Sequence, residues 1–340
     1  MRLNINDFDY PFNPALIAQR PLSNRDQSRL LALDREKGTT EQRKFFEIGD
    51  YLNSGDLLVL NNTRVVPHRL YGRKEKTGGE VELLLLKKVN NDIWEVMVNR
   101  RVKAGIKITF SSSCRCKIIE TKGPYITVKF YYDGGWDNIL SEIGSMPIPP
   151  YIKRRPCDED REWYQTVYAS EEGAIAAPTA GLHFTKELLD RLRDKGVLIT
   201  GVTLHVGAGT FKPVKAEWIE EHKMDHEWFD VNNDTVDLIH KAKKAGGRVV
   251  AVGSTSMRAL EQSAMDGVLR PSKGETDLFI YPGFKFRVVD ALVTNFHLPK
   301  STLIMLVMAF AGRVNIMKAY AEAVSLKYRF YSYGDAMLII

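Results

Sequence analysis

The pattern of apolar and polar residues changes twice along the chain, and this change constrains the fold more than any other feature of the sequence. Between Val65 and about Met146, short strand-like runs follow one another, with Gly, Asn, Asp or Ser between them and little helical periodicity. Such a pattern is typical of a small β-barrel or sandwich. After Tyr151, strand-like and helix-like segments alternate, which indicates a parallel or mixed sheet covered by helices. We therefore expect an α/β fold, a mixed-sheet α/β domain with an inserted small β-barrel domain.

The boundaries of the two domains rest on two short segments. The strand-like run Leu57–Leu60 stops abruptly at Asn61, and Met146–Tyr151 carries three prolines. The segment Met146–Tyr151 is typical of a stiff, extended linker, because each proline fixes φ and disfavours helix before it. We assign residues 1–64 and 151–340 to the α/β catalytic domain and residues 65–150 to the inserted β-barrel domain.

Composition narrows the class of protein. The chain is 44% hydrophobic and 26% charged, as soluble globular proteins are. Its longest apolar stretch, Leu303 to Ala311, is too short to span a bilayer, and the first residues have no apolar signal core. The three cysteines form no CxxC pair, so we expect neither a disulfide framework nor a zinc knuckle. We expect a cytoplasmic protein with no membrane contact.

Three short loops each carry one histidine at the end of an apolar, strand-like run. They hold His183, His205 and His297 beside small, polar or Gly/Pro residues. Ligands bind at the carboxyl ends of strands in α/β sheets, and imidazole is suited to proton transfer near neutral pH. We therefore predict one composite active site in which the three side chains border a single cleft. Three hydrogen-bonded structural histidines would produce the same pattern.

His183 lies just before Thr185, the predicted N-cap of a helix that continues to Lys195. We expect its side chain at the open mouth of this turn. An alanine at this position would then lose little packing, and would change the free energy of unfolding by no more than about 1 kcal/mol.

Two further polar turns follow predicted strands. At Gly253–Arg258 a strand gives way to a helix N-terminus, whose free N–H groups could hold a carboxylate or phosphate. An ordinary helix cap with an exposed Arg258 is the simpler reading. Asn61–Arg64 gathers amide, hydroxyl and guanidinium groups that could bind a purine, a ribose or a carboxylate. A strand-capping Asx turn explains that segment equally well.

His222 and His226 are four residues apart, but the glutamate of the H-E-x-x-H motif is missing. We therefore predict a solvated or partner-facing segment there and no metal site. The net charge is +6, and basic residues cluster at Arg100–Lys103, Lys153–Arg155 and Lys241–Lys244. Such clusters usually form a solvated face, but three of them on a basic chain favour an RNA-facing surface with phosphate contacts.

Several long motifs together resemble the S-adenosylmethionine:tRNA ribosyltransferase-isomerase family, which acts late in queuosine biosynthesis. The motifs are Ala176–Thr185, Thr203–Phe211, Thr294–Leu303 and Tyr328–Ile339, with further similarity at Asp56–Arg64, Met146–Ile152 and Tyr164–Ala169. Two positions depart from the family pattern. Ser254 replaces a usual second threonine, and Asp225 stands where a histidine is expected, which weakens a role for that segment.

The resemblance implies an unusual reaction and a two-domain fold, an α/β domain plus a β-barrel. S-adenosylmethionine gives its ribosyl moiety to 7-aminomethyl-7-deazaguanine at the tRNA wobble position, and the products are epoxyqueuosine in tRNA, adenine and methionine. The partners would be tRNA carrying this base and S-adenosylmethionine, a consumed co-substrate. We expect no cofactor beyond it, and a monomer.

The chemistry of this reaction sets several requirements for the active site. The sulfonium acidifies the ribose C5′ protons, so a general base can start an elimination. Adenine leaves more easily with a proton or hydrogen bonds, and the methionine carboxylate needs a cation or a helix end. We take His183, His205 and His297 as candidate catalytic residues. The candidate substrate-binding residues are Asn61, Asn62, Thr63, Arg64, Thr179, Gly181, Phe184, Gly207, Thr210, Arg258, Asn295 and Asp335, and the candidate tRNA-binding residues are Lys153, Arg154 and Arg155.

Two other functions are consistent with parts of the sequence. An S-adenosylmethionine-dependent RNA methyltransferase would use the same donor, but the turn at Gly253 lacks a Gly-rich fingerprint. A non-catalytic RNA-binding protein would explain the basic clusters but not three histidine loops. The products separate these functions, since a methyltransferase would release S-adenosylhomocysteine.

Overall fold

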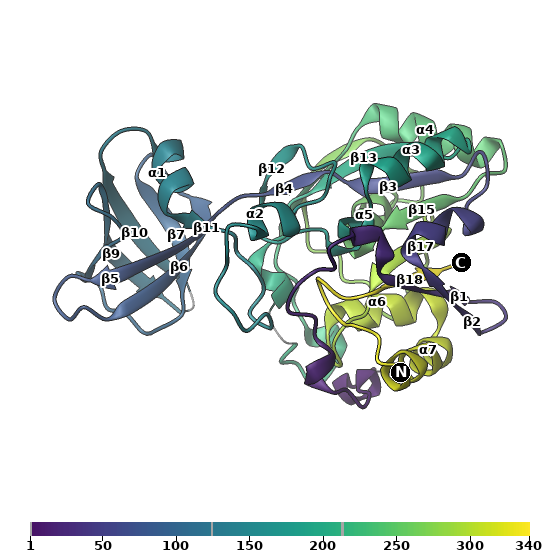
Figure 1. The fold of residues 1–340 in the computed structure, drawn as a ribbon, viewed down its shortest axis with the longest axis horizontal. Helices are drawn as coiled ribbons and strands as arrows, with labels where there is room; N and C mark the ends of the chain where they lie inside the picture. The colour runs from purple at the N-terminus through teal and green to yellow at the C-terminus, as the bar shows by residue number, and fades with distance from the viewer. Residues whose placement is uncertain (1, 124, 212–213) are drawn as a thin grey trace. The chain divides into compact units, whose positions relative to one another are not determined.

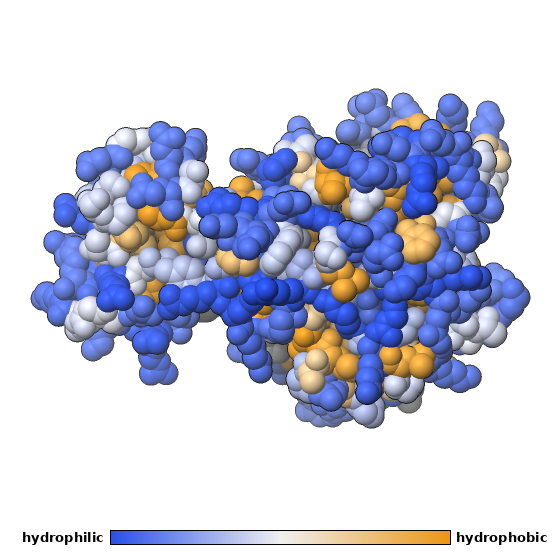
Figure 2. Space-filling view, viewed as in Figure 1, coloured by the Kyte–Doolittle hydropathy of each residue, from blue (hydrophilic) through white to orange (hydrophobic). Residues whose placement is uncertain are grey.

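The computed structural model describes residues 2–123, 125–211 and 214–340. These residues form two compact units (Figure 1). The first unit contains the chain up to Arg64, Pro150–Arg154 and everything from Gln165 onward. The second contains Val65–Pro149 and Arg155–Tyr164. In Figure 2, hydrophilic residues cover most of the visible surface of each unit, and apolar residues appear in small patches.

The first unit is built on a nine-stranded mixed sheet with the order β16-β14-β13-β3-β15-β17-β18-β1-β2. Its strands are β1 (Arg29–Asp34), β2 (Thr39–Lys44), β3 (Leu57–Asn61), β13 (Leu198–Leu204), β14 (Glu227–Val231), β15 (Val249–Val252), β16 (Ser272–Thr276), β17 (Ala291–Asn295) and β18 (Ala336–Ile339). The four neighbours β13, β3, β15 and β17 are parallel, whereas β18 runs antiparallel to β17 and parallel to β1. The predicted mixed-sheet α/β fold is confirmed.

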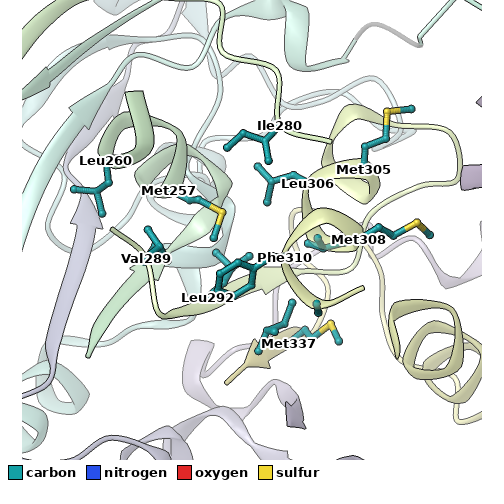
Figure 3. Packing of buried hydrophobic residues seen from close by; sticks show 14 of the residues in the cluster. Met257, Leu260, Ile280, Val289, Leu292, Met305, Leu306, Met308, Phe310 and Met337 are labelled. Carbon is teal, nitrogen blue, oxygen red and sulfur yellow. The ribbon is translucent and has the colours of Figure 1, made fainter. Parts of the chain in front are cut away.

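Both faces of this sheet are buried, which explains the continuous apolar runs of its central strands. In β3, Leu57 and Val59 face one hydrophobic cluster, and Leu58 and Leu60 face another. The first cluster is covered by α4 (Asn233–Lys244), α5 (Gly253–Gln262), α6 (Thr302–Ala311) and α7 (Arg313–Ser325), and the second by α3 (Lys186–Asp194). Figure 3 shows Met257 of α5 pointing toward Leu306 and Phe310 of α6 in the first cluster.

Capping residues set the helix ends as the sequence predicts. Thr185 is the N-cap of α3, and its Oγ1 accepts a hydrogen bond from Leu188 N at 3.1 Å. Gly312, with φ of 81°, separates α6 from α7. Among the described residues, no single helix is both long and apolar enough to cross a bilayer, although α6 and α7, bent by 118°, meet those criteria as a pair.

The second unit is a closed antiparallel barrel of six strands, in the order β5-β6-β7-β10-β9-β8, with β8 pairing back to β5. Its strands are β5 (Arg69–Lys74), β6 (Glu80–Lys88), β7 (Ile93–Val98), β8 (Lys107–Thr109), β9 (Cys114–Lys122) and β10 (Tyr125–Tyr132), and β11 (Gly144–Ser145) pairs antiparallel with the start of β5. The interior is filled by apolar side chains, including Cys114 and Cys116. Burial raises the pKa of the Cys114 thiol to about 11, so this cysteine is unreactive at neutral pH.

The remaining elements are α1 (Trp136–Ile143), α2 (Asp160–Trp163), the strand pair β4 (Thr63–Val65) and β12 (Glu171–Ala174), and short 3₁₀ helices that include η5 (Thr179–His183). Residues 155–164, which we placed in the α/β domain, pack with the barrel instead. Arg155 pairs with Glu80 at 3.0 Å, and Arg161 donates to the carbonyl of Gly144 at 2.9 Å. These long-range contacts leave no local signal in the sequence.

Candidate active site

The polar loops of the first unit gather along one edge of the large sheet. Because β13, β3, β15 and β17 are parallel, their carboxyl ends lie at the same edge. β18 runs the other way and β1 runs parallel to it, so the amino ends of these two strands lie there too. From β13 to β1, this edge carries His205, Asn61, Gly253, Asn295, Asp335 and Ser28. The fold therefore aligns candidate residues that are far apart in sequence.

His183 lies in η5, buried inside this edge. Its side chain is 4% exposed, and the ring packs against Phe45. Ser28 Oγ lies 2.8 Å from Nδ1, and Asn295 Nδ2 lies 3.0 Å from Nε2. Asn295 in turn accepts a hydrogen bond from Thr179 Oγ1 at 2.8 Å. The expectation that His183 stands at an open mouth is wrong.

The hydrogen bonds fix the protonation of this ring. Asn295 Nδ2 is a donor, and it also points at the carbonyl of Asp335 at 3.5 Å. Nε2 of His183 must therefore accept, and Nδ1 carries the proton and donates to Ser28. Burial and the nearby Arg329 cation lower the pKa of His183 to about 3. A neutral, doubly hydrogen-bonded, buried imidazole is a structural element of the edge.

His183→Ala is expected to lower the free energy of unfolding by about 2–5 kcal/mol, because it leaves buried Ser28 and Asn295 without their partner. Urea unfolding of the parent and the variant measures this difference. A loss below about 1 kcal/mol, with turnover abolished, would show instead that His183 acts in the chemistry.

Stability should also fall in acid. Burial lowers the pKa of both His183 and His297 to about 3 in the folded chain, whereas an unfolded histidine titrates near 6.5. The unfolded state therefore binds protons first, so this stability is fully present above pH 6.5 and is lost as the pH falls toward 3. Near pH 5 the two residues should contribute a slope of about 2.7 kcal/mol per pH unit. Urea unfolding at a series of pH values measures it, and a flat profile would contradict the buried neutral state.

Asp335 is occupied by the chain itself. Its carboxylate accepts hydrogen bonds from the backbone N–H groups of Arg29 and Arg329 at 3.0 and 2.8 Å, and from Arg29 Nε at 3.1 Å. The side chain is 1% exposed. Asp335 therefore fixes the start of β1 to the segment before β18, and the structure gives it no free oxygen for a substrate.

His297 belongs to a buried aromatic cluster. Its Nε2 lies 2.8 Å from Thr294 Oγ1, and its backbone N–H donates to the hydroxyl of Tyr320 at 3.1 Å. The hydroxyl of Tyr10 donates to its carbonyl. The neighbouring Phe296 packs against three aromatic rings, including that of Tyr320. These contacts fit a histidine that holds the end of β17 in place.

His205 is different, because it is only half-buried. It follows the end of β13, and its ring stacks on Trp228 with 5.0 Å between centroids and an interplanar angle of 19°. Nδ1 lies 2.8 Å from Thr63 Oγ1, and no described residue hydrogen-bonds to Nε2. Burial lowers the pKa of His205, while the Glu171 carboxylate opposes this shift. The ring is thus oriented, neutral at pH 7 and open at one nitrogen.

The chain passes close to this ring at Gly173 in β12. A Cβ at position 173 would lie 2.8 Å from His205 Nε2 and 2.9 Å from both adjacent ring carbons. The backbone there has φ of 148°, which a side chain would strain. Glycine at this position therefore lets the chain approach the imidazole, and no feature of the local sequence marks it.

Asn61 links three segments of the edge. Its Nδ2 donates to Leu204 O and to Thr255 Oγ1, each at 3.0 Å. Its Oδ1 accepts from the N–H groups of Leu204 at 3.0 Å and Thr63 at 3.2 Å. With four hydrogen bonds and no exposed surface, the Asn61 side chain holds the segments of Thr63, Leu204 and Thr255 together.

The next residues of this turn are also tied to the chain. Asn62 Oδ1 accepts from Thr203 Oγ1 at 2.7 Å, and Arg64 donates to the carbonyl of Ala169 at 2.6 Å. Thr63 holds His205. The segment therefore positions its neighbours, and the Asx-turn reading describes it better than direct substrate binding.

A cavity of about 70 Å³ lies beside the N-terminus of α5, with room for about five water molecules. Its polar walls come from Gly209, Thr210, His222, Lys223, Asp225, Glu227, Ser254, Thr255, Arg258 and Thr302, and its apolar walls from Met224, Leu278, Phe279, Ile280, Leu303 and Leu306. Cations, carboxylates and hydroxyls thus meet an apolar wall. None of the three loop histidines lines this cavity, so the single-cleft hypothesis stays a prediction.

Arg258 and Glu227 form a buried ion pair in this wall. Their side chains are 7% and 5% exposed, and Arg258 Nη1 donates to Glu227 Oε2. Glu227 Oε1 accepts from Gly207 N at 2.8 Å, and Arg258 Nε donates to Leu278 O at 2.9 Å. Arg258 Nη2 is buried and has no hydrogen-bond partner among the described residues. The prediction of an exposed Arg258 is wrong, because α5 turns it inward.

Residues His222–Asp225 and Glu227, expected in a solvated or partner-facing segment, supply a wall of this cavity. Asp225 packs against Gly209, where a Cβ would lie 2.3 Å from its Oδ2. Glu227 enters because β14 returns antiparallel to β13. In the sequence, this segment is a run of acidic residues and histidines, which is typical of a solvated turn.

The remaining candidates fall into three groups. Gly181 and Phe184 are buried in the packing around η5, where Phe45 contacts the Phe184 ring. Thr210 lines the cavity, and Gly207 donates its backbone N–H to Glu227 in the cavity wall. Lys153 and Arg154 are held to Gln19 through Lys153 N and Arg154 Nε, whereas Arg155 belongs to the second unit. Within the described ranges, no three His, Cys, Asp or Glu side chains are arranged to hold a metal ion.

Comparison with known proteins gives a consistent result. Residues 5–339 match the model of a family described as queuosine biosynthesis protein. The chain is 51% identical, over 99% of its length and 100% of the relative, to an S-adenosylmethionine:tRNA ribosyltransferase-isomerase of Staphylococcus haemolyticus. It is also similar to the crystal structure of an S-adenosylmethionine tRNA ribosyltransferase from Thermotoga maritima, with 38% identity, a TM-score of 0.57, and 98% and 100% of the two chains covered.

Proposed function

Because this chain belongs to the queuosine biosynthesis protein family of S-adenosylmethionine:tRNA ribosyltransferase-isomerases, we propose that His205 and the Arg258 cavity form its catalytic centre. The enzyme transfers and isomerises the ribosyl moiety of S-adenosylmethionine onto 7-aminomethyl-7-deazaguanine in tRNA. Adenine and methionine leave. The observations that carry the proposal are a half-buried histidine and, at the same edge of the sheet, a cavity that combines a buried arginine, carboxylates and a helix N-terminus.

His205 is the proton-transfer residue in this proposal. The reaction needs a base for an acidified C5′ proton, and a histidine must be in its neutral, unprotonated form before it can act as that base. The pKa of His205 lies below its ordinary value because of burial, so the imidazole is in its basic form at pH 7. Trp228 and Thr63 hold the ring, and Nε2 is left for the substrate. His183 and His297, with pKa values near 3 and buried rings, support the edge.

The cavity takes the amino-acid end of S-adenosylmethionine. This end carries a carboxylate and an ammonium on one α-carbon, five heavy atoms in all. Arg258 Nη2 has no acceptor within the described chain, and a carboxylate seated there would supply one, aided by the N-terminus of α5. Asp225 and Glu227 offer charge to the ammonium, and Leu278 and Leu306 form an apolar wall for the methylene groups.

His205 follows the end of β13, and Glu227 of the cavity wall begins the neighbouring strand β14. Trp228 follows Glu227 in β14, and Asn61 connects the Leu204 backbone to Thr255 in the cavity wall. A donor with its amino-acid end at Arg258 would extend its sulfonium and ribose along this edge. We propose no cofactor beyond this co-substrate, a monomeric enzyme and a cytoplasmic location.

Lys153, Arg154 and Arg155 remain a proposed tRNA contact. Their contribution differs from residue to residue, because Arg155 already pairs with Glu80 and lies over the ring of Tyr71. Replacing all three with alanine and measuring tRNA affinity against salt tests the cluster. An unchanged salt slope would make it a solvated face.

The function itself is tested by following the donor. The protein is incubated with tRNA carrying the deazaguanine precursor and with S-adenosylmethionine labelled in the ribose. Label in tRNA together with free adenine and methionine supports the proposal. S-adenosylhomocysteine as the product would indicate methyl transfer, and tRNA binding without turnover would indicate a binding protein.

A further inference from the structure

The outer face of the barrel carries a row of lysines that the catalytic proposal does not use. Strand pairing puts Lys107 of β8 opposite Lys117 of β9, and Lys117 opposite Lys129 of β10. The residues next to these lysines within the strands, such as Cys116 and Val128, point into the barrel core. Because neighbouring residues of a strand face opposite sides, all three lysines point outward. Across three strands the row spans about 10 Å.

The lysines of this row repel one another, and no ion pair in the described part of the chain offsets that repulsion. Like charges directly opposite one another destabilise a sheet, and no ion pair with a described acidic residue involves Lys107, Lys117 or Lys129. Lysines often guard a free sheet edge against aggregation. That explanation fails here, because β8 pairs with β9 on one side and with β5 on the other. An external polyanion would account for the charges.

An aromatic residue and a groove adjoin the row. Arg115 lies opposite Tyr131 in the neighbouring register position, and the Tyr131 side chain is 43% exposed. Lys129 Nζ lies 5.5 Å from the centre of the Tyr131 ring. Both residues line an open groove of about 580 Å³ whose floor includes the hydroxyls of Ser111–Ser113. Asp92 and Asp133 also line this groove, and Asp92 accepts a hydrogen bond from Tyr132.

We propose that the outer face of β8, β9 and β10 binds the backbone of the tRNA substrate, with Tyr131 stacking on an unpaired base in the adjacent groove. The proposal rests on the function above, which makes tRNA the partner. Lysines neutralise phosphates without regard to sequence, and an exposed aromatic ring beside cations is the usual platform for a single-stranded base. RNA is therefore the polyanion that fits both features of this face.

The test compares two variants of the full chain that lose the same charge. Lys107, Lys117 and Lys129 are changed to Gln in the first. The matched control changes Lys76, Lys87 and Lys88, which are exposed in the same unit. Lys87 and Lys88 lie on β6, three strands from β9 in either direction around the barrel. The affinity for a full-length tRNA transcript is measured over a range of salt, after thermal melts have shown that each variant is folded.

The first variant should lower the slope of log affinity against log salt by about 2 and weaken binding about tenfold or more at moderate salt, whereas the control should do neither. Tyr131→Leu should weaken binding about five- to a hundredfold at an unchanged slope. Equal effects of both lysine variants, or a parental slope in the first, would overturn the inference. If even the parent chain binds no tRNA, the proposed function fails as well. The assay needs no turnover, so it is independent of the roles of His205 and Arg258.

Discussion

Replacing His205 with alanine is expected to lower kcat by about 10²- to 10⁴-fold, the usual loss when a general acid or base is removed. Folding should be little affected, because the ring is half-buried and loses one stacking contact with Trp228 and one hydrogen bond with Thr63. Single-turnover release of adenine measures the chemical step directly. His226, an exposed histidine in the same region, provides a matched control, and His226→Ala should turn over at the parental rate.

The pH profile gives this assignment a second readout. Since the pKa of His205 lies below 6.5, the rate should be constant near neutral pH and fall only as the pH drops through that lowered pKa. The Glu171 carboxylate raises the pKa of His205, so Glu171→Gln should move the acidic limb to lower pH. An acidic limb that stays in place in Glu171→Gln, or full turnover by His205→Ala, would remove His205 from the reaction.

Replacing Arg258 with methionine should have the largest combined effect on binding and stability. The KM for S-adenosylmethionine is expected to rise about 10- to 100-fold, because the carboxylate loses a charged, pre-oriented donor. The free energy of unfolding should fall by about 3–5 kcal/mol, because Glu227 is left buried without its cation. Initial-rate kinetics and urea unfolding separate these two effects.

A second variant separates a binding role from a structural one. Arg258→Met combined with Glu227→Leu removes the whole buried pair, so most of the lost stability should return, but the KM should stay high. A sulfonium analogue without the α-carboxylate should bind the parent and Arg258→Met about equally. If the double variant regains the parental KM, Arg258 only supports the fold and the carboxylate binds elsewhere.

Local pattern was sufficient for most of the elements. The cap at Thr185 predicted the start of α3, and the structure places Leu188, Leu189 and Leu192 of this helix in the core. The alternating runs of the barrel and the helix–strand alternation after it gave the architecture. What the sequence did not show was residues 155–164 packing with the barrel, since the contacts of Arg155 and Arg161 come from residues far away in the chain.

The site was predicted less well, for the same reason. The three histidines have similar local sequences, yet His183 is enclosed by Ser28 and Asn295, which are 155 and 112 residues away. Glu227 reaches Arg258 only because β14 pairs with β13. Burial and pairing are long-range properties, so the sequence could name candidate residues but could not rank them.

The hydrogen bonds of the Asn61 side chain have a consequence for which substitutions this enzyme tolerates. One amide holds the backbone next to His205 and the hydroxyl of Thr255 at the cavity wall, so in the proposed site this side chain helps to set the spacing between His205 and the donor. Both loops can accept substitutions elsewhere without altering that spacing. A substitution at Asn61 would therefore disturb the proposed reaction geometry, although Asn61 itself would not need to touch the substrate.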